Sequence, residues 1–480
     1  MKQDTNGSRA GSILLNASSL IAANFLTRIV TVPITALLLR TIDEQAFGRY
    51  SYLIAFVSIF SAVANLGLPN YVGREAVQQP ERAPQLLKTA YLLQLVFSAV
   101  AMAAIVGVGG RDWLMVLSGL GMVSGATATL FLFLMNGQRR SYLSAGVQFI
   151  ATVFNTLGTL FVIFIAPTVD ALLWVYALTG VLTHILSYLV MVHYSPELKF
   201  QPGWPRWADY RAIFVESLPY VFLLGFSTLY FRVGVVLLET WSTYTEIALY
   251  SAAFKFVELV LVLVSVFAGV FFAEFSLIYA QGGQELEQFM RRGFRAMVLL
   301  SLPIGAVLSF CGHDILYLFY GSKYLASTPM LQVLAWTTIF LFARSLQTCL
   351  LQACNLVRIQ ALVFAGSSLL AIGLNWALIP RYGGVGAAVA TLLCEAFNWA
   401  AFSYFLRARL GIVLLERWVP PAAIAFASMC AVLWLGPALW LRVILGPLVF
   451  GLVFWASGGI QPDDAALFKR LVTKLGLKDA

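Results

Sequence analysis

The feature that most constrains this chain is a series of long apolar runs separated by short polar segments. About twenty apolar residues cross the hydrocarbon core of a bilayer as a helix. Reading the runs by length gives fourteen candidate spans: 13–39, 50–68, 89–108, 114–136, 143–166, 171–193, 213–238, 247–274, 294–311, 328–354, 359–379, 385–406, 419–435 and 438–457. Because a backbone in lipid must satisfy its own hydrogen bonds, this pattern predicts an all-α polytopic membrane protein.

Composition supports the same class. Of the 480 residues, 60% are hydrophobic and only 11% are charged, too few polar side chains to cover a soluble globule of one or two domains. No connecting segment is long enough to form a separate soluble domain. The net charge of +9 does not indicate nucleic acid as a partner, because the basic residues do not gather on one soluble face.

The basic residues outside the spans predict the orientation of the chain. If the amino terminus lies inside, the cytoplasmic segments hold twenty-one lysines and arginines, and the opposite side holds only five, Arg40, Arg49, Arg111, Lys323 and Arg381. Basic residues are enriched in cytoplasmic loops. We therefore expect both termini in the cytoplasm, and the positive net charge is mostly this bias.

Short motifs recur in the same order in the two halves of the chain. Tyr50 and Ser51 before the second span match Tyr250 and Ser251 before the eighth, 200 residues later. Asn136 with Arg139, followed by Asn155, are matched by Asn355 with Arg358, followed by Asn375. We expect an N-terminal lobe over residues 1–200, a C-terminal lobe over 201–410, and an extra helix pair with a cytoplasmic tail over 411–480. Since six spans return the chain to its starting side, the axis relating the lobes would lie along the membrane normal.

Four basic residues lie deep within spans and are the candidate binding residues: Arg28, Arg232, Lys255 and Arg344. A charge in the hydrocarbon region is costly, so each needs a partner, a water-filled cavity or an anionic ligand. Arginine suits phosphate because its planar guanidinium can bond two oxygens at once. Arg442, near the end of the last span, can instead extend to the outer interface.

The deep acidic residues are Glu258 and Glu395, which are candidate coupling groups or charge partners. Lys255 and Glu258 are spaced i, i+3 on one helix, so they can neutralise each other. The alternative for the whole set is that the charges pair with one another only to orient the packing of helices. The excess of basic over acidic residues favours a cavity that takes an anion.

No enzymatic or cofactor motif is present in the sequence. There is no Gly-rich phosphate loop with its lysine, no nucleophile elbow and no paired carboxylates in a soluble segment. The five cysteines show no metal-ligand spacing and are interpreted as packing residues. His184 and His193 show no neighbours in sequence for a metal site or a proton relay. We therefore expect no enzymatic activity, no metal and no cofactor.

Several of these residues together resemble the bacterial polysaccharide-unit flippases, of O-antigen type, in the multidrug, oligosaccharidyl-lipid and polysaccharide exporter superfamily. The resemblance rests on Arg28 and Pro33 in the first span, Tyr50-Ser51, and the run from Pro380 to Ala388 that leads toward Glu395. It covers residues 10–410 in organisation. It implies two six-helix lobes around a V-shaped central cavity, in which deep basic residues meet a pyrophosphate. Many such flippases have twelve spans, and the extra pair here would be either a groove for a lipid tail or a peripheral hairpin.

The resemblance implies a function in surface polysaccharide assembly. By alternating access, the protein would move undecaprenyl-pyrophosphate-linked oligosaccharides from the cytoplasmic to the periplasmic leaflet of the bacterial inner membrane. Its partners would be the lipid-linked oligosaccharide and membrane lipids, with a polysaccharide polymerase and chain-length machinery as further candidates. Two alternatives are a cation-coupled multidrug exporter of the same superfamily and a membrane scaffold that transports nothing.

Overall fold

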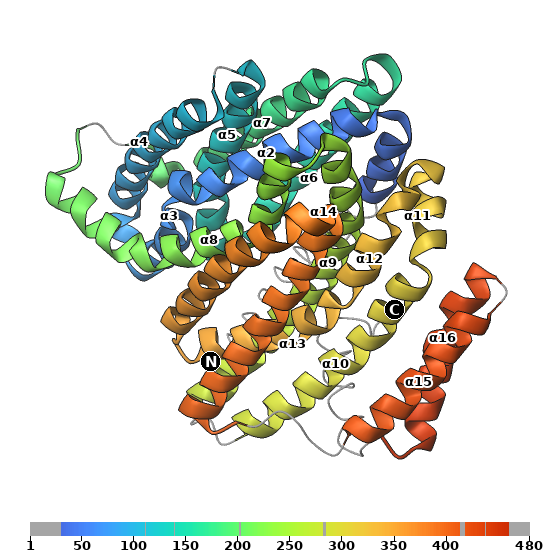
Figure 1. The fold of residues 1–480 in the computed structure, drawn as a ribbon. Helices are drawn as coiled ribbons and strands as arrows, with labels where there is room; N and C mark the ends of the chain where they lie inside the picture. The colour runs from blue at the N-terminus through green and yellow to red at the C-terminus, as the bar shows by residue number, and fades with distance from the viewer. Residues whose placement is uncertain are drawn as a thin grey trace. The chain divides into compact units, whose positions relative to one another are not determined.

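The computed structural model describes residues 30–110, 112–138, 140–200, 203–281, 285–412, 418–436 and 438–459, and all regular structure in them is helical (Figure 1). Eleven of the helices are long and apolar enough to cross a membrane, and two shorter apolar helices cover Val30–Thr41 and Val419–Leu435. Each of the fourteen predicted spans overlaps a described helix, and α14 (Val357–Leu410) contains two of them. The chain is an all-α polytopic membrane protein, as predicted.

The chain divides into two compact units after Val236, inside α8. Unit 1 contains the helix Val30–Thr41, α2 (Glu44–Asn65), α3 (Leu68–Gln78), α4 (Ala83–Gly109), α5 (Trp113–Gly137), α6 (Ser141–Ile165), α7 (Val169–Tyr194) and most of α8 (Trp207–Trp241), with short 3-10 turns at Pro80–Arg82 and Pro196–Leu198. The predicted division at residues 200 and 410 follows the count of spans and stays a prediction.

Two glycines let α5 and α7 approach closely in unit 1. A Cβ added to Gly180 would lie 2.6 Å from the carbonyl oxygen of Gly121, and a Cβ added to Gly121 would lie 2.5 Å from the ring of Tyr176. Small residues at such crossings allow backbone contact where no hydrophobic effect drives helices together. In the same unit, α2 and α4 also pack against α5.

Unit 2 contains the end of α8 followed by α9 (Tyr244–Ala280), α10 (Leu286–Phe310), α11 (Gly312–Tyr320), a 3-10 segment (Ser322–Ser327), α12 (Thr328–Ala335), α13 (Thr337–Ala353), α14, α15 (Val419–Leu435) and α16 (Leu439–Ala456). The span predicted over 328–354 corresponds to one candidate membrane span, Ser322–Ala353, which divides into α12 and α13 at Trp336. α15 and α16 form a hairpin that packs on α10 (Figure 1).

A backbone reversal at Gly383 separates the two halves of α14. Gly383 has φ 52° and ψ −133°, a conformation that side chains other than glycine rarely adopt. The amide of Gly384 donates a hydrogen bond of 3.0 Å to Oε2 of Glu246 on α9. The halves correspond to the predicted spans 359–379 and 385–406, and they pack against each other where Cys394 meets Ser367.

The repeat read from the sequence coincides with the helix boundaries. α2 begins at Glu44 and α9 begins at Tyr244, so the matched Tyr-Ser pairs occupy the same position in their helices. Each helix is preceded by a capping side chain, because Asp43 accepts from the amides of Gln45 and Ala46, and Thr243 accepts from that of Glu246. Equivalent positions of matched residues in two helices are expected if the two helices belong to a repeated unit.

Large apolar side chains cover much of the surface of both units. Phe164 is 75% exposed, Leu369 is 72% exposed and Trp434 is 77% exposed. In water such a surface would aggregate, whereas in a bilayer it faces acyl chains.

Candidate functional site

Arg344 and Glu395 form a two-point ion pair inside unit 2. Nε of Arg344, on α13, donates to Oε2 of Glu395 at 2.9 Å, and Nη2 donates to Oε1 at 3.3 Å. Glu395 lies in the second half of α14, and the two side chains are 11% and 1% exposed. The guanidinium also lies 5.5 Å from the ring centroid of Phe364, on the first half of α14. Arg344 therefore joins three helical segments of unit 2.

The interior around this pair is polar. Nε2 of Gln347, three residues after Arg344, donates to Oγ of Ser403 at 2.7 Å. Asn398, one turn after Glu395, is fully buried, and its amide oxygen and nitrogen have no hydrogen-bond partner among the described residues. Charges interact strongly in such an interior because little water screens them. The geometry assigns Arg344 and Glu395 to each other as charge partners, and binding of substrate by Arg344 stays a prediction.

Lys255 and Glu258 form the ion pair expected from their spacing on α9. Nζ of Lys255 lies 2.8 Å from Oε2 of Glu258, and the side chains are 39% and 23% exposed. Both deep acids are thus paired with a base, although Glu258 and Glu395 also make further interactions. Lys255 is far more accessible than Arg344, so its ammonium can still meet a ligand.

The remaining predicted cations belong to the first part of the chain. Arg232, on α8, is half-buried and lies near Tyr176 on α7. Arg28 lies outside the described residues, so its role stays a prediction.

Unit 1 also contains a polar network that the sequence did not reveal. His184 on α7 lies between two hydroxyls, with Nδ1 2.9 Å from Oγ1 of Thr127 and Nε2 3.2 Å from the hydroxyl of Tyr91. Asn65, at the end of α2, accepts hydrogen bonds from Gln94 at 3.3 Å and Thr129 at 2.9 Å. These residues come from four helices, so only the packing brings them together.

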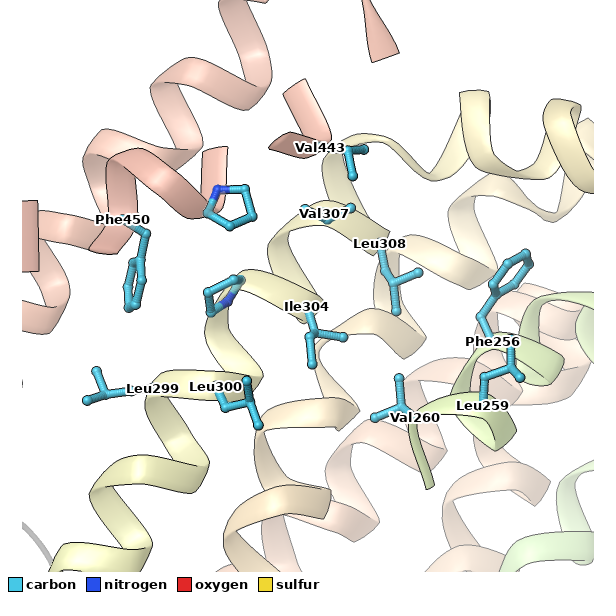
Figure 2. Close-up of a pocket in the computed structure, with 12 residues that line it drawn as sticks. Phe256, Leu259, Val260, Leu299, Leu300, Ile304, Val307, Leu308, Val443 and Phe450 are labelled. Carbon is cyan, nitrogen blue, oxygen red and sulfur yellow. The ribbon is translucent and has the colours of Figure 1, made fainter. Parts of the chain in front are cut away.

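An apolar groove of about 510 Å³ lies between α9, α10 and α16 in unit 2 (Figure 2). Phe256 and Val260 contribute from α9, Leu300 and Ile304 from α10, and Phe450 from α16. No side chain that lines it is charged or polar. Its size and lining fit a hydrocarbon chain.

Arg442 anchors α16 at its N-terminal end. Nη2 of Arg442 bonds Oδ2 of Asp314 on α11, so the arginine expected to extend to the outer interface is paired with an acid. This ion pair fixes α16 to the rest of unit 2 beside the groove. In the part of the chain that the structure describes, no group of three or more His, Cys, Asp or Glu side chains is arranged to hold a metal ion.

Comparison with known proteins finds a matching family model and two similar chains. Residues 13–276 match the family model described as "Polysaccharide biosynthesis protein". The chain is 22% identical over 448 residues to the "Probable low-salt glycan biosynthesis flippase Agl15" of Haloferax volcanii, covering 90% of this chain and 93% of that protein. It is 24% identical over 164 residues to the "Uncharacterized membrane protein MJ1068" of Methanocaldococcus jannaschii, covering 34% and 32% of the two chains.

Solved structures share the fold. The inward closed conformation of the lipid II flippase MurJ matches with a TM-score of 0.67 at 14% identity, covering 95% of this chain and 99% of that one. An inward-facing multidrug resistance transporter of the MATE family matches with a TM-score of 0.62 at 12% identity, covering 82% and 98%. The family model spans more than half of the chain, and the chain therefore belongs to the polysaccharide biosynthesis protein family, as a flippase-type transporter with the fold of the multidrug, oligosaccharidyl-lipid and polysaccharide exporter superfamily.

Proposed function

We propose that this protein moves undecaprenyl-pyrophosphate-linked oligosaccharides from the cytoplasmic to the periplasmic leaflet by alternating access, for surface polysaccharide assembly. The observation that carries the proposal is the similarity to the flippase Agl15 over nearly the whole length of both chains. The membrane would be the bacterial inner membrane, with both termini cytoplasmic. A polysaccharide polymerase and its chain-length machinery are the proposed protein partners.

The proposed substrate has three parts with different chemistry: an oligosaccharide, a pyrophosphate and a polyprenyl tail. Each part needs a different surface. A pyrophosphate cannot cross hydrocarbon unaided, because burying an unpaired charge costs far more than burying apolar surface gains. Arg28, Arg232, Lys255 and Arg344 are the proposed cations that meet it. The polyprenyl tail needs only an apolar path, and the groove between α9, α10 and α16 supports this part of the proposal.

The second candidate function is a cation-coupled multidrug exporter, which the fold match to the MATE transporter favours. Such an exporter would use acidic residues within the membrane to bind cations. Here Glu258 is paired with Lys255, and Glu395 is paired with Arg344. These pairs make both acids poor sites for a cationic drug, so the flippase is the better proposal.

Vesicles that contain a labelled polyprenyl-pyrophosphate oligosaccharide test the proposal. The purified protein should bring the labelled lipid to the opposite leaflet, where an added glycosidase can reach it. A scaffold would leave the lipid on its starting side, and a drug exporter would move a fluorescent cation instead. Either of those two results would contradict the proposal.

Replacing Arg28 by alanine is the most direct test of the proposed cations. Loss of a charge-assisted hydrogen bond to phosphate typically weakens an interaction by about tenfold or more, so the Arg28→Ala variant should move the lipid at least about tenfold more slowly. Arg40→Ala is the matched control, because Arg40 is exposed on the helix Val30–Thr41. Normal transport by Arg28→Ala, at normal levels in the membrane, would remove Arg28 from the site.

A further inference from the structure

A second cavity, polar where the groove is apolar, lies between α3, α4 and the start of α8 in unit 1. We call it the α3–α4–α8 pocket, and its volume is about 520 Å³. It is lined by Tyr71, Glu75, Gln79, Arg82, Gln85, Leu86, Thr89, Arg206, Asp209, Ala212, Ile213 and Glu216. The neighbouring basic residues predict that this end of unit 1 faces the cytoplasm.

The lining groups are held in place by one another. The hydroxyl of Tyr71 lies close to the carboxylate of Glu216. Nε2 of Gln85 donates to Oδ2 of Asp209 at 3.1 Å, which brings α4 and α8 together. Tyr71 is buried, whereas Gln85 and Glu216 are exposed, so the pocket has a packed floor and an open rim.

The charges of the pocket are close to balanced, which argues against an anionic ligand. Three carboxylates line it, those of Glu75, Asp209 and Glu216, with two guanidiniums, those of Arg82 and Arg206. Glu75 is also paired with Arg74 at 2.9 Å, just outside the lining. A phosphate would meet more carboxylates than guanidiniums here, in contrast to the deep cations of the spans.

The side-chain chemistry instead matches a ligand rich in hydroxyl groups. A hydroxyl donates one hydrogen bond and accepts others at the same time. Carboxylates supply strong acceptors, arginines supply donors, and the amides of Gln79 and Gln85 supply both. A cavity of this volume lies within the range of small-molecule sites.

We propose that the α3–α4–α8 pocket binds a neutral sugar residue of the lipid-linked oligosaccharide before the head group enters the membrane. The proposal rests on the proposed function for its choice of ligand. It assigns to the first unit a sugar site that is separate from the cations proposed for the pyrophosphate. Discrimination between oligosaccharides would then begin at this pocket.

Binding of simple sugars to the full-length protein in detergent tests the pocket. The probes are methyl glycosides of hexoses and N-acetylhexosamines. Binding is followed by calorimetry and by the fluorescence of Trp204 and Trp207, which are 85% and 81% exposed and lie within two residues of the lining residue Arg206 in the sequence. At least one glycoside should bind saturably. Asp209→Asn and Glu216→Gln should each weaken its binding by about tenfold. Glu81→Gln is the matched control, because Glu81 is exposed in the turn before α4 but does not line the pocket.

Two further results decide the source and the class of the ligand. The lipid-linked oligosaccharide should compete with the bound glycoside, and inorganic phosphate should not. Absence of saturable binding, unchanged binding in both variants, lack of competition by the lipid-linked sugar, or displacement by phosphate would each overturn the pocket. The flippase proposal is judged separately, because the vesicle assay with the wild-type protein succeeds or fails whether or not free glycosides bind.

Discussion

Arg344 and Glu395 are charged residues that are buried inside unit 2. Each alone would be costly in the interior of unit 2, and the two-point geometry offsets that cost. Removing one partner of a buried pair leaves the other charge buried without a partner. Replacing both partners by apolar groups leaves no buried charge. The pair therefore stabilises the fold only as a unit.

This asymmetry predicts the outcome of a double-mutant cycle. Glu395→Leu or Arg344→Leu alone should lower the free energy of unfolding by about 3–5 kcal/mol, and the double variant should recover most of that loss. Thermal and denaturant unfolding in detergent measure these differences. Arg49→Ala is a control, because Arg49 and Asp112 are 42% and 31% exposed and such a pair contributes about 1 kcal/mol or less. Additive losses at Arg344 and Glu395 would contradict the cycle.

At the scale of elements, the reversal inside α14 depends on a conformation that favours glycine. An alanine at position 383 would be strained at φ 52°, and its Cβ would lie 3.2 Å from Oε2 of Glu246. Gly383→Ala should lower the free energy of unfolding by about 1–3 kcal/mol. Gly373→Ala, in the helical first half with open space around its Cβ, should be neutral or stabilising. Equal effects on unfolding would show that the reversal is not strained.

The groove between α9, α10 and α16 makes a prediction about the length of the lipid tail. Ile304→Trp should fill the groove and slow the movement of long polyprenyl carriers severalfold, while short-chain carriers are moved at nearly the normal rate (Figure 2). Initial rates in vesicles with carriers of two lengths measure this. Leu448→Trp is the control, because Leu448 is 55% exposed on α16 and does not line the groove. An equal slowing of both carriers would place the defect elsewhere.

At the scale of the whole molecule, the distribution of basic residues predicts the orientation. A fluorescent protein fused after Ala480 should fluoresce, and alkaline phosphatase fused there should be inactive, because both report a cytoplasmic carboxyl terminus. Phosphatase fused after Gly110 should be active, since that turn precedes Arg111 on the predicted outer side. The reverse pattern of activities would overturn the topology.

The positions of the long apolar helices could be predicted because hydropathy acts over the twenty residues of one span and needs no knowledge of its neighbours. Helical periodicity, which is also local, predicted the pairing of Lys255 with Glu258, since these residues lie one turn apart on a single helix. Hydropathy did not predict that α12 ends and α13 begins at Trp336, because both helices belong to one apolar run.

The sequence by itself determined the all-helical membrane class, the positions of the long apolar helices and the presence of costly charges within them. Only the tertiary structure decided what those charges and the polar groups around them contact. Arg344 meets Glu395 across 51 residues of sequence, and His184 meets Tyr91 and Thr127 from two other helices. The physical reason is that hydropathy and helical periodicity are local, whereas a buried charge or imidazole is satisfied by whichever helix packs against it.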